Sequence, residues 1–161
     1  MKLLKNHILI SIITIALSIL LLAGCGSDSD HDDHDEVPVG LVLSVNGTEL
    51  AMQEETTVTY ASGNHIELSQ NATLGPILVE FISEDGDRFT PHSDEGFSLQ
   101  YSAESSNIIT MASVTGANEW TFQLIGNEAG ETTIRFQLMH SGHSDFESRP
   151  FQVRVTSLQP Q

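Results

Sequence analysis

The sequence predicts an all-β domain over residues 37–158, folded as an antiparallel β-sandwich. Apolar and polar residues alternate in short bursts across this region, which is the period of a strand with one buried face. No segment longer than about ten residues has helical spacing. Turn residues separate the bursts at roughly ten-residue intervals, which favours two packed sheets. No sequence period repeats, so a propeller or a solenoid is excluded.

The first predicted element is a β-hairpin. Residues 41–45 and 48–50 flank Asn46-Gly47, and these two residue types accept the positive φ angles that a type I′ turn requires. The later strands are short runs bounded by turn residues. In chain order they are expected at residues 56–60, 65–68, 77–82, 88–90, 97–101, 108–114, 120–125, 132–139 and 151–155. The core between the sheets is expected to hold Trp120, Phe122, Phe136, Leu138 and Phe151.

Residues 1–24 are expected to form a lipoprotein signal peptide. Lys2 and Lys5 precede an apolar run over residues 8–22, which is shorter than the ~20 residues that a membrane-spanning helix needs. The run ends in Leu-Ala-Gly-Cys at residues 22–25, which resembles the lipobox of bacterial lipoproteins. The resemblance implies cleavage before Cys25, lipidation of its sulfur and acylation of the new N-terminus.

Cys25 is the only cysteine, so an internal disulfide is excluded. Several acyl chains would attach the protein stably to a membrane. The expected location is therefore the bacterial cell envelope, with the lipid anchor as the membrane contact. Gly26 stands where the lipoprotein family has an aspartate for inner-membrane retention, which favours the outer membrane in a host that has two.

A tether is expected between the anchor and the domain, comprising residues 25–36. After Cys25 it holds six acidic residues together with His31 and His34, and it has no apolar side chain, so we expect disorder. One interpretation is a solvated spacer that its own charge extends. The other is a tail that collects zinc, nickel or copper ions through imidazole and carboxylate ligands.

The charge balance excludes nucleic acid as a partner. The chain carries 6 Lys and Arg against 22 Asp and Glu, a formal charge of −16. An enzyme is not expected either, because the chain contains no Gly-x-Ser-x-Gly or His-Glu-x-x-His motif. Asp85-Gly86-Asp87 lacks the further acidic positions of a calcium loop and is predicted to be a turn.

Two segments resemble the C-terminal half of bacterial Ig-like domains. They are Asn-Ile-Ile-Thr-Met-Ala at residues 107–112 and Leu-Ile-Gly-Asn-Glu-Ala-Gly-Glu-Thr-Thr-Ile at residues 124–134. The resemblance implies an Ig-like sandwich. It implies no particular function, because this fold is a scaffold for many.

The residues best suited to chemistry follow the strand predicted at 132–139. His140, His143 and Asp145 lie within six residues, and Gly142 lets the chain double back. Two imidazoles across a tight turn can bind one ion, and a carboxylate can bind it or orient a histidine. His65 and His92, both in polar loops, are candidates for a third ligand.

Residues 130–150 also resemble uncharacterised bacterial lipoproteins that have an acidic, histidine-bearing tether and the same ending. Those relatives often carry histidines in the strand that here spans residues 120–125, where Gln123 occupies the corresponding place. The sequence therefore predicts a non-enzymatic, membrane-anchored lipoprotein that binds zinc or copper for buffering, delivery or sensing. The alternative is a structural or adhesive module that contacts an envelope protein and has no metal role.

Overall fold

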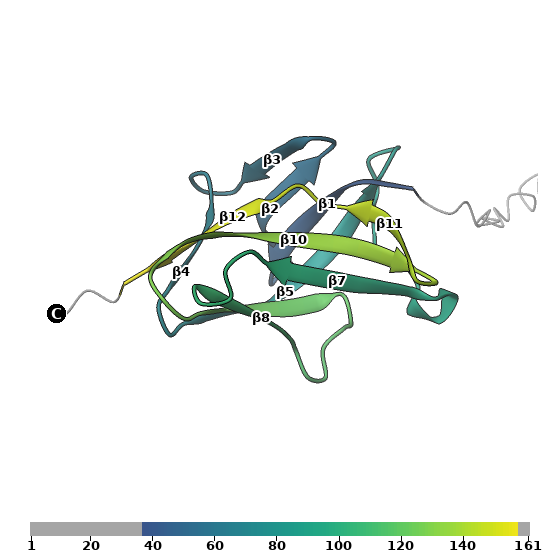
Figure 1. Ribbon diagram of the computed structural model, residues 1–161. Coiled ribbons are helices and arrows are strands. Elements are labelled where there is room, and N and C mark those ends of the chain that lie inside the picture. Colours follow the sequence, from purple (N-terminus) through teal and green to yellow (C-terminus); the bar gives the residue numbers. More distant parts are fainter. Residues whose placement is uncertain (1–36, 158–161) are drawn as a thin grey trace, which may run out of the picture. The chain divides into compact units, whose positions relative to one another are not determined.

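The computed structural model describes residues 37–157, which form a sandwich of two β-sheets (Figure 1). This confirms the predicted all-β fold, and the arrangement is consistent with an Ig-like domain. The predicted signal peptide, Cys25, His31 and His34 lie outside the described residues. No helix within residues 37–157 is long and apolar enough to cross a membrane.

The strands follow one another with short connections. They are β1 (Pro38–Val45), β2 (Thr48–Glu54), β3 (Thr57–Tyr60), β4 (Ile66–Ser69), β5 (Thr73–Ser83), β6 (Arg88–Phe89), β7 (Phe97–Ala103), β8 (Ile109–Ser113), β9 (Thr121–Gly126), β10 (Gly130–His140), β11 (His143–Glu147) and β12 (Phe151–Thr156). One 3-10 turn, η1 (Ser93–Glu95), precedes β7.

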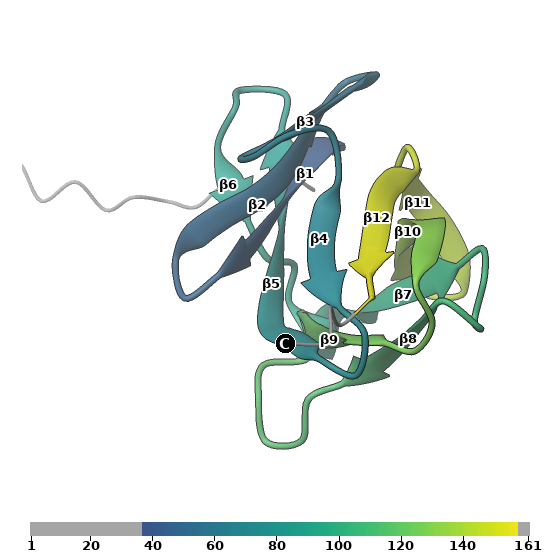
Figure 2. The same cartoon turned by 90° about the vertical axis from the view of Figure 1, so that its left-hand side faces the viewer.

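Sheet A has the strand order β3-β2-β1-β5-β9-β8, with β6 also paired to β5. Sheet B has the order β11-β10-β12-β4, with β7 paired to the other side of β10. The pairs are antiparallel except that of β4 and β12, which run parallel and lie side by side in Figure 2. This parallel pair departs from the purely antiparallel arrangement that the sequence predicts.

The hairpin at the start of the domain has the predicted turn. Asn46 has a φ of 50° and Gly47 a φ of 76°, so both central residues are in the left-handed region that a type I′ turn uses. The turn places Val45 opposite Thr48 and sets the register of β1 against β2. Local sequence alone therefore determines this connection.

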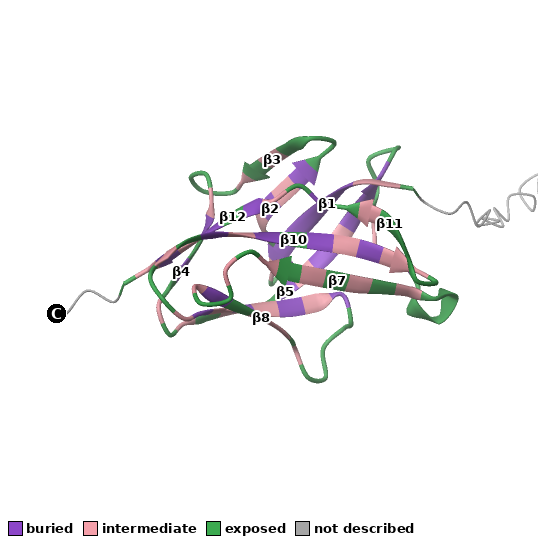
Figure 3. Ribbon diagram, in the orientation of Figure 1, coloured by how far each residue is buried: buried purple, intermediate pink, exposed green. Residues whose placement is uncertain are grey.

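The core lies between the inner faces of the two sheets, where the buried residues gather (Figure 3). The five residues predicted to fill it are all buried. The Phe136 ring of sheet B lies 5.2 Å from that of Phe122 in sheet A and 5.9 Å from that of Phe151. The Phe122–Phe136 contact joins the two sheets, and the Phe136–Phe151 contact packs two strands of sheet B together. Buried apolar area of this kind is the main source of stability in such a fold.

One strand, β11, was not predicted from the sequence. Residues 143–147 were expected to be a loop, but they form β11. β12 covers β10 only from Gly130 to Ile134, so the far half of β10 has a free side, and β11 pairs with it from Gln137 to His140. The strand is stabilised by this pairing, while its own residues are mostly exposed and carry a weak strand pattern.

Candidate metal site at the β10–β11 hairpin

A two-residue turn places the predicted ligands His140 and His143 at the tip of a hairpin. β10 ends at His140, β11 begins at His143, and the two residues are paired directly across the ladder. The intervening Ser141 and Gly142 have φ angles of 49° and 89°, as a type I′ turn requires. Residues paired in this way project to the same face, with Cβ atoms about 4.5–5.5 Å apart.

Asp145 reaches the same tip because of a β-bulge. Leu138 is paired with Phe146 and Met139 with Ser144, which leaves Asp145 as the extra residue of β11. A bulge re-aims the side chain of the extra residue. The Asp145 Oδ2 atom lies 3.3 Å from Nδ1 of His140.

The His140 ring is also held from its other side. It stacks on Phe97, the residue opposite it on β7, with ring centroids 4.1 Å apart and an angle of 22° between the planes. Stacking and the carboxylate contact together restrict the orientation of the imidazole, and Nε2 has no hydrogen-bond partner among the described residues. The His140 and Asp145 side chains are 37% and 39% exposed, so the tip is open to solvent.

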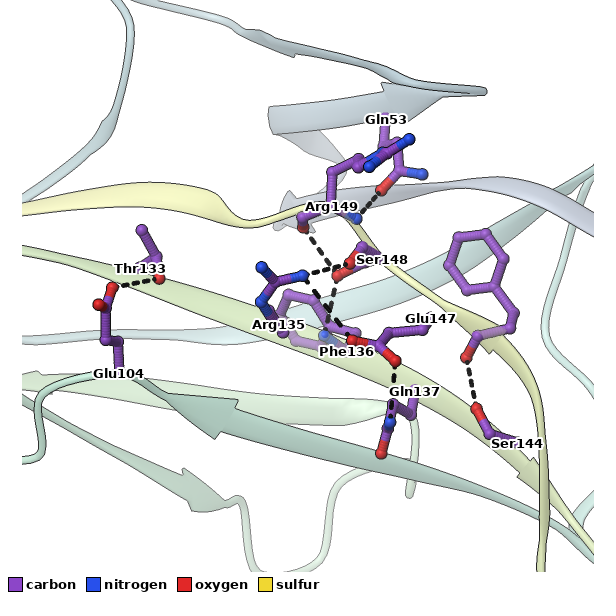
Figure 4. A network of polar contacts seen from close by, with 11 residues as sticks. Gln53, Glu104, Thr133, Arg135, Phe136, Gln137, Ser144, Glu147, Ser148 and Arg149 are labelled. Carbon is purple, nitrogen blue, oxygen red and sulfur yellow. Dashed lines mark hydrogen bonds and ion pairs between the residues drawn. The ribbon is translucent and has the colours of Figure 1, made fainter.

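β11 is anchored to the rest of the fold at its far end. The Phe146 ring packs edge-on against Phe81 of sheet A, with centroids 5.8 Å apart. Beyond β11, Ser148 is buried, and its Oγ accepts a hydrogen bond from the Phe136 N–H at 2.9 Å and donates one to the Arg149 carbonyl at 2.9 Å (Figure 4). The hairpin is therefore held firmly at its base while its tip is exposed.

A buried glutamine of sheet A completes this network. The Gln53 Oε1 atom accepts a hydrogen bond from the Arg149 N–H at 2.6 Å, and its Nε2 donates to the Glu55 carbonyl at 2.8 Å. Figure 4 shows Gln53 reaching across from β2 to the segment that links β11 to β12. Sequence reasoning missed this residue, because nothing in the pattern of β2 marks one glutamine as buried.

The structure separates His65 from the hairpin. His65 immediately precedes Ile66, which is paired with Val153, and Val153 is paired with Thr132. Thr132 lies eight residues before His140 on β10, which corresponds to roughly 26 Å along the strand. The two ring nitrogens of His65 instead lie 2.7 Å from Asn64 Oδ1 and 3.2 Å from Glu67 Oε2.

His92 lies in the segment that packs beside the turn. It is the exposed residue before η1. Gly96, which follows η1, accepts a hydrogen bond at its carbonyl from the Ser141 N–H at 3.2 Å. Within residues 37–157, no three His, Cys, Asp or Glu side chains come close enough to hold one metal ion. The described residues thus bring His140, His143 and Asp145 to one hairpin tip, without a closed set of ligands.

One feature of the tip was not predicted from the sequence. Phe97 was expected in a strand, but its stacking on His140 depends on the pairing of β7 with β10. Gln123 lies on β9 of sheet A, whereas the hairpin belongs to sheet B. No protein-family model matches this chain, and no curated protein sequence matches it.

Proposed function

We propose that this protein is a non-enzymatic, lipid-anchored component of the bacterial cell envelope that binds Zn²⁺ or Cu²⁺ reversibly at the β10–β11 hairpin. The observation that carries the proposal is the pairing of His140 with His143 across a two-residue turn, with Asp145 beside Nδ1 of His140. Cys25 is the proposed point of attachment to the membrane.

The chemistry of the three side chains suits these ions. Imidazole is a preferred ligand of zinc and copper, and a carboxylate on one ring nitrogen of a histidine selects the other nitrogen for the metal and raises its basicity. In this assignment His140 binds through Nε2, His143 supplies a second imidazole, and water fills the remaining positions. The exposure of the tip favours exchange of the ion, which suits buffering, delivery or sensing.

Long-range charge supports the same proposal. The 22 acidic residues outnumber the 6 basic ones, so the protein attracts cations to its surface. The acidic tether with His31 and His34 adds weak ligands of the same kinds near the anchor.

The test is thermal unfolding of the full chain in nonionic detergent, with and without Zn²⁺ or Cu²⁺. An ion that binds only the folded state raises the midpoint, with a stabilisation of about 2.7 kcal/mol at a hundredfold excess over Kd. The His140→Ala/His143→Ala double variant is expected to lose this shift. His65→Ala, which changes a distant histidine, is the control and is expected to keep it.

The His31→Ala/His34→Ala double variant separates the tether from the domain. Binding to the tether consumes metal without stabilising the fold, so this variant is expected to keep the shift in midpoint while its total metal uptake falls. Absence of a shift with both metals, or an equal shift in His140→Ala/His143→Ala, would overturn the proposal.

A further inference from the structure

β7 is an edge strand of sheet B that lacks protecting residues within the strand itself. It pairs with β10 on one side, and no strand among residues 37–157 pairs with its other side, which lies at the margin of sheet B (Figure 1). Its sequence, Phe-Ser-Leu-Gln-Tyr-Ser-Ala, contains no charged residue and no proline. Charged side chains and proline are the common means by which proteins prevent another strand from adding to an edge.

The other edges of the sandwich are shorter or charged. β3 and β4 have four residues each, and β8 has five. β11 carries Asp145 and Glu147 and is interrupted by its bulge. β7, with seven residues in regular register, is thus the longest edge that is free of charge.

The hydrogen bonds at the two ends of β7 determine which backbone groups face outward. The Ser141 N–H donates to the Gly96 carbonyl, and the Glu104 N–H donates to the Thr133 carbonyl. Both bonds join directly opposed residues, and hydrogen-bonded pairs alternate along an antiparallel ladder. Residues 98, 100 and 102 therefore bond to β10, and residues 97, 99, 101 and 103 direct their N–H and C=O groups away from it.

The same outward-bonding residues have incompletely covered side chains. Phe97, Leu99 and Tyr101 are half-buried on the inner face of the sheet, whereas Phe136 and Leu138, their neighbours on β10, are 0% and 1% exposed. A strand added alongside β7 would satisfy the free backbone groups and cover the exposed flank of these side chains.

The acidic residues at the ends of β7 indicate which kind of strand can pair with this edge. Exposed acidic residues stand at both ends of the edge, Asp94 and Glu95 before β7 and Glu104 after it, and Oε2 of Glu104 accepts a hydrogen bond from Thr133 Oγ1 of β10 at 2.9 Å. A second copy paired antiparallel through β7 would bring Glu95 of one copy near Glu104 of the other, and this like-charge contact opposes self-pairing. A segment with basic ends would instead meet opposite charge at each end.

We propose that the β7 edge binds an extended segment of a partner protein by β-strand addition, and that this segment has an uncharged middle and Lys or Arg at both ends. Glu95 and Glu104 are nine residues apart, which corresponds to roughly 30 Å of strand, so the segment needs about ten residues. The proposal is independent of metal binding at the hairpin and agrees with the alternative role as a module that contacts an envelope protein.

The test uses a fluorescein-labelled peptide, Lys-Lys-Thr-Val-Thr-Val-Thr-Val-Thr-Lys-Lys, and the full chain in nonionic detergent, with binding followed by fluorescence anisotropy. A peptide with Glu in place of every Lys is expected to bind at least about tenfold more weakly. In the protein, the Glu95→Gln/Glu104→Gln variant is expected to weaken binding of the Lys peptide and to leave the unfolding midpoint nearly unchanged.

Backbone methylation of the peptide tests the mode of binding without altering the protein. Methyl groups on alternate backbone nitrogens remove the N–H donors along one edge of the peptide, either the edge that faces β7 or the opposite edge. One of the two methylated peptides is expected to lose about tenfold or more in affinity, and the other to keep it. Equal affinities of these two peptides, or no binding of the Lys peptide, would overturn the proposal.

Two further measurements fix the site and the occupant. In Leu99→Pro the outward N–H of β7 is removed without the loss of a bond to β10, so peptide binding should disappear while thermal unfolding shows a folded domain. If the chain self-associates without peptide and Leu99→Pro abolishes this self-association, the occupant of the β7 edge is a second copy. That result would overturn the assignment. His143→Ala is expected to bind the peptide normally, which separates this proposal from the metal site.

Discussion

Gln53 is the residue of sheet A that links β2 to the segment between β11 and β12, so its replacement by methionine tests whether this polar link stabilises the sandwich. The side chain is 3% exposed, and both ends of its amide are hydrogen-bonded, to the Arg149 N–H and to the Glu55 carbonyl. Methionine has a similar volume, so the change removes the hydrogen bonds without leaving a large cavity.

The expected cost follows from those two bonds. Each contributes about 0.5–1.5 kcal/mol to the free energy of unfolding, and a partner left unsatisfied in a water-poor site adds about 1–3 kcal/mol. The hydrogen bond to the Arg149 N–H is partly buried, and this N–H has no other hydrogen-bond partner among the described residues, so it carries most of the second cost. We therefore expect Gln53→Met to lower the free energy of unfolding by about 2–6 kcal/mol.

Urea unfolding followed by Trp120 fluorescence measures this change. Trp120 is the only tryptophan, is 2% exposed and packs edge-on against Phe81 at 5.9 Å, so its emission reports the packing of the core. With a slope of about 1.5 kcal/mol per molar urea, a loss of about 3 kcal/mol lowers the midpoint by about 2 M.

Gln152→Met is the matched control, because Gln152 is exposed on β12 and a surface change costs within about 0.5 kcal/mol. A Gln53→Met midpoint that equals that of the control would refute the assigned role of Gln53. It would mean that water or a local shift satisfies the Arg149 N–H.

Three other changes have definite expected outcomes. Burial raises the pKa of Tyr60 above 10.0, and the hydrogen bond from the Gln152 N–H lowers it by less, so the folded state favours the protonated hydroxyl. The stability that this protonated hydroxyl contributes is complete below about pH 10 and is lost as the pH rises through the raised pKa. Tyr60→Phe should therefore lose less stability at alkaline pH, as measured by unfolding midpoints from about pH 9 to 11. Gly40→Ala places a Cβ atom 2.2 Å from a backbone oxygen of β2 and should destabilise by about 1–3 kcal/mol or more in urea unfolding. Asp145→Asn removes the charge beside His140 and should weaken metal binding about 10–100-fold by calorimetry, and an unchanged affinity would contradict the orienting role of this carboxylate.

The sequence by itself determined the class of fold, the first hairpin and the core. Alternation of polar and apolar residues marks which side of each strand is buried, and the core residues from Trp120 to Phe151 follow it. Asn46-Gly47 determines its turn because the requirement for positive φ is local to those two residues. The same local chemistry indicated that the chain doubles back at Gly142.

Only the tertiary structure decided how the candidate site is arranged. β11 exists because half of β10 is left free by β12, and the stacking of Phe97 on His140 exists because β7 takes one particular register. The separation of His65 from the hairpin likewise depends on the order of strands in sheet B. Strand order and register are set by contacts between residues far apart in the chain, and one sequence carries no local pattern that specifies them.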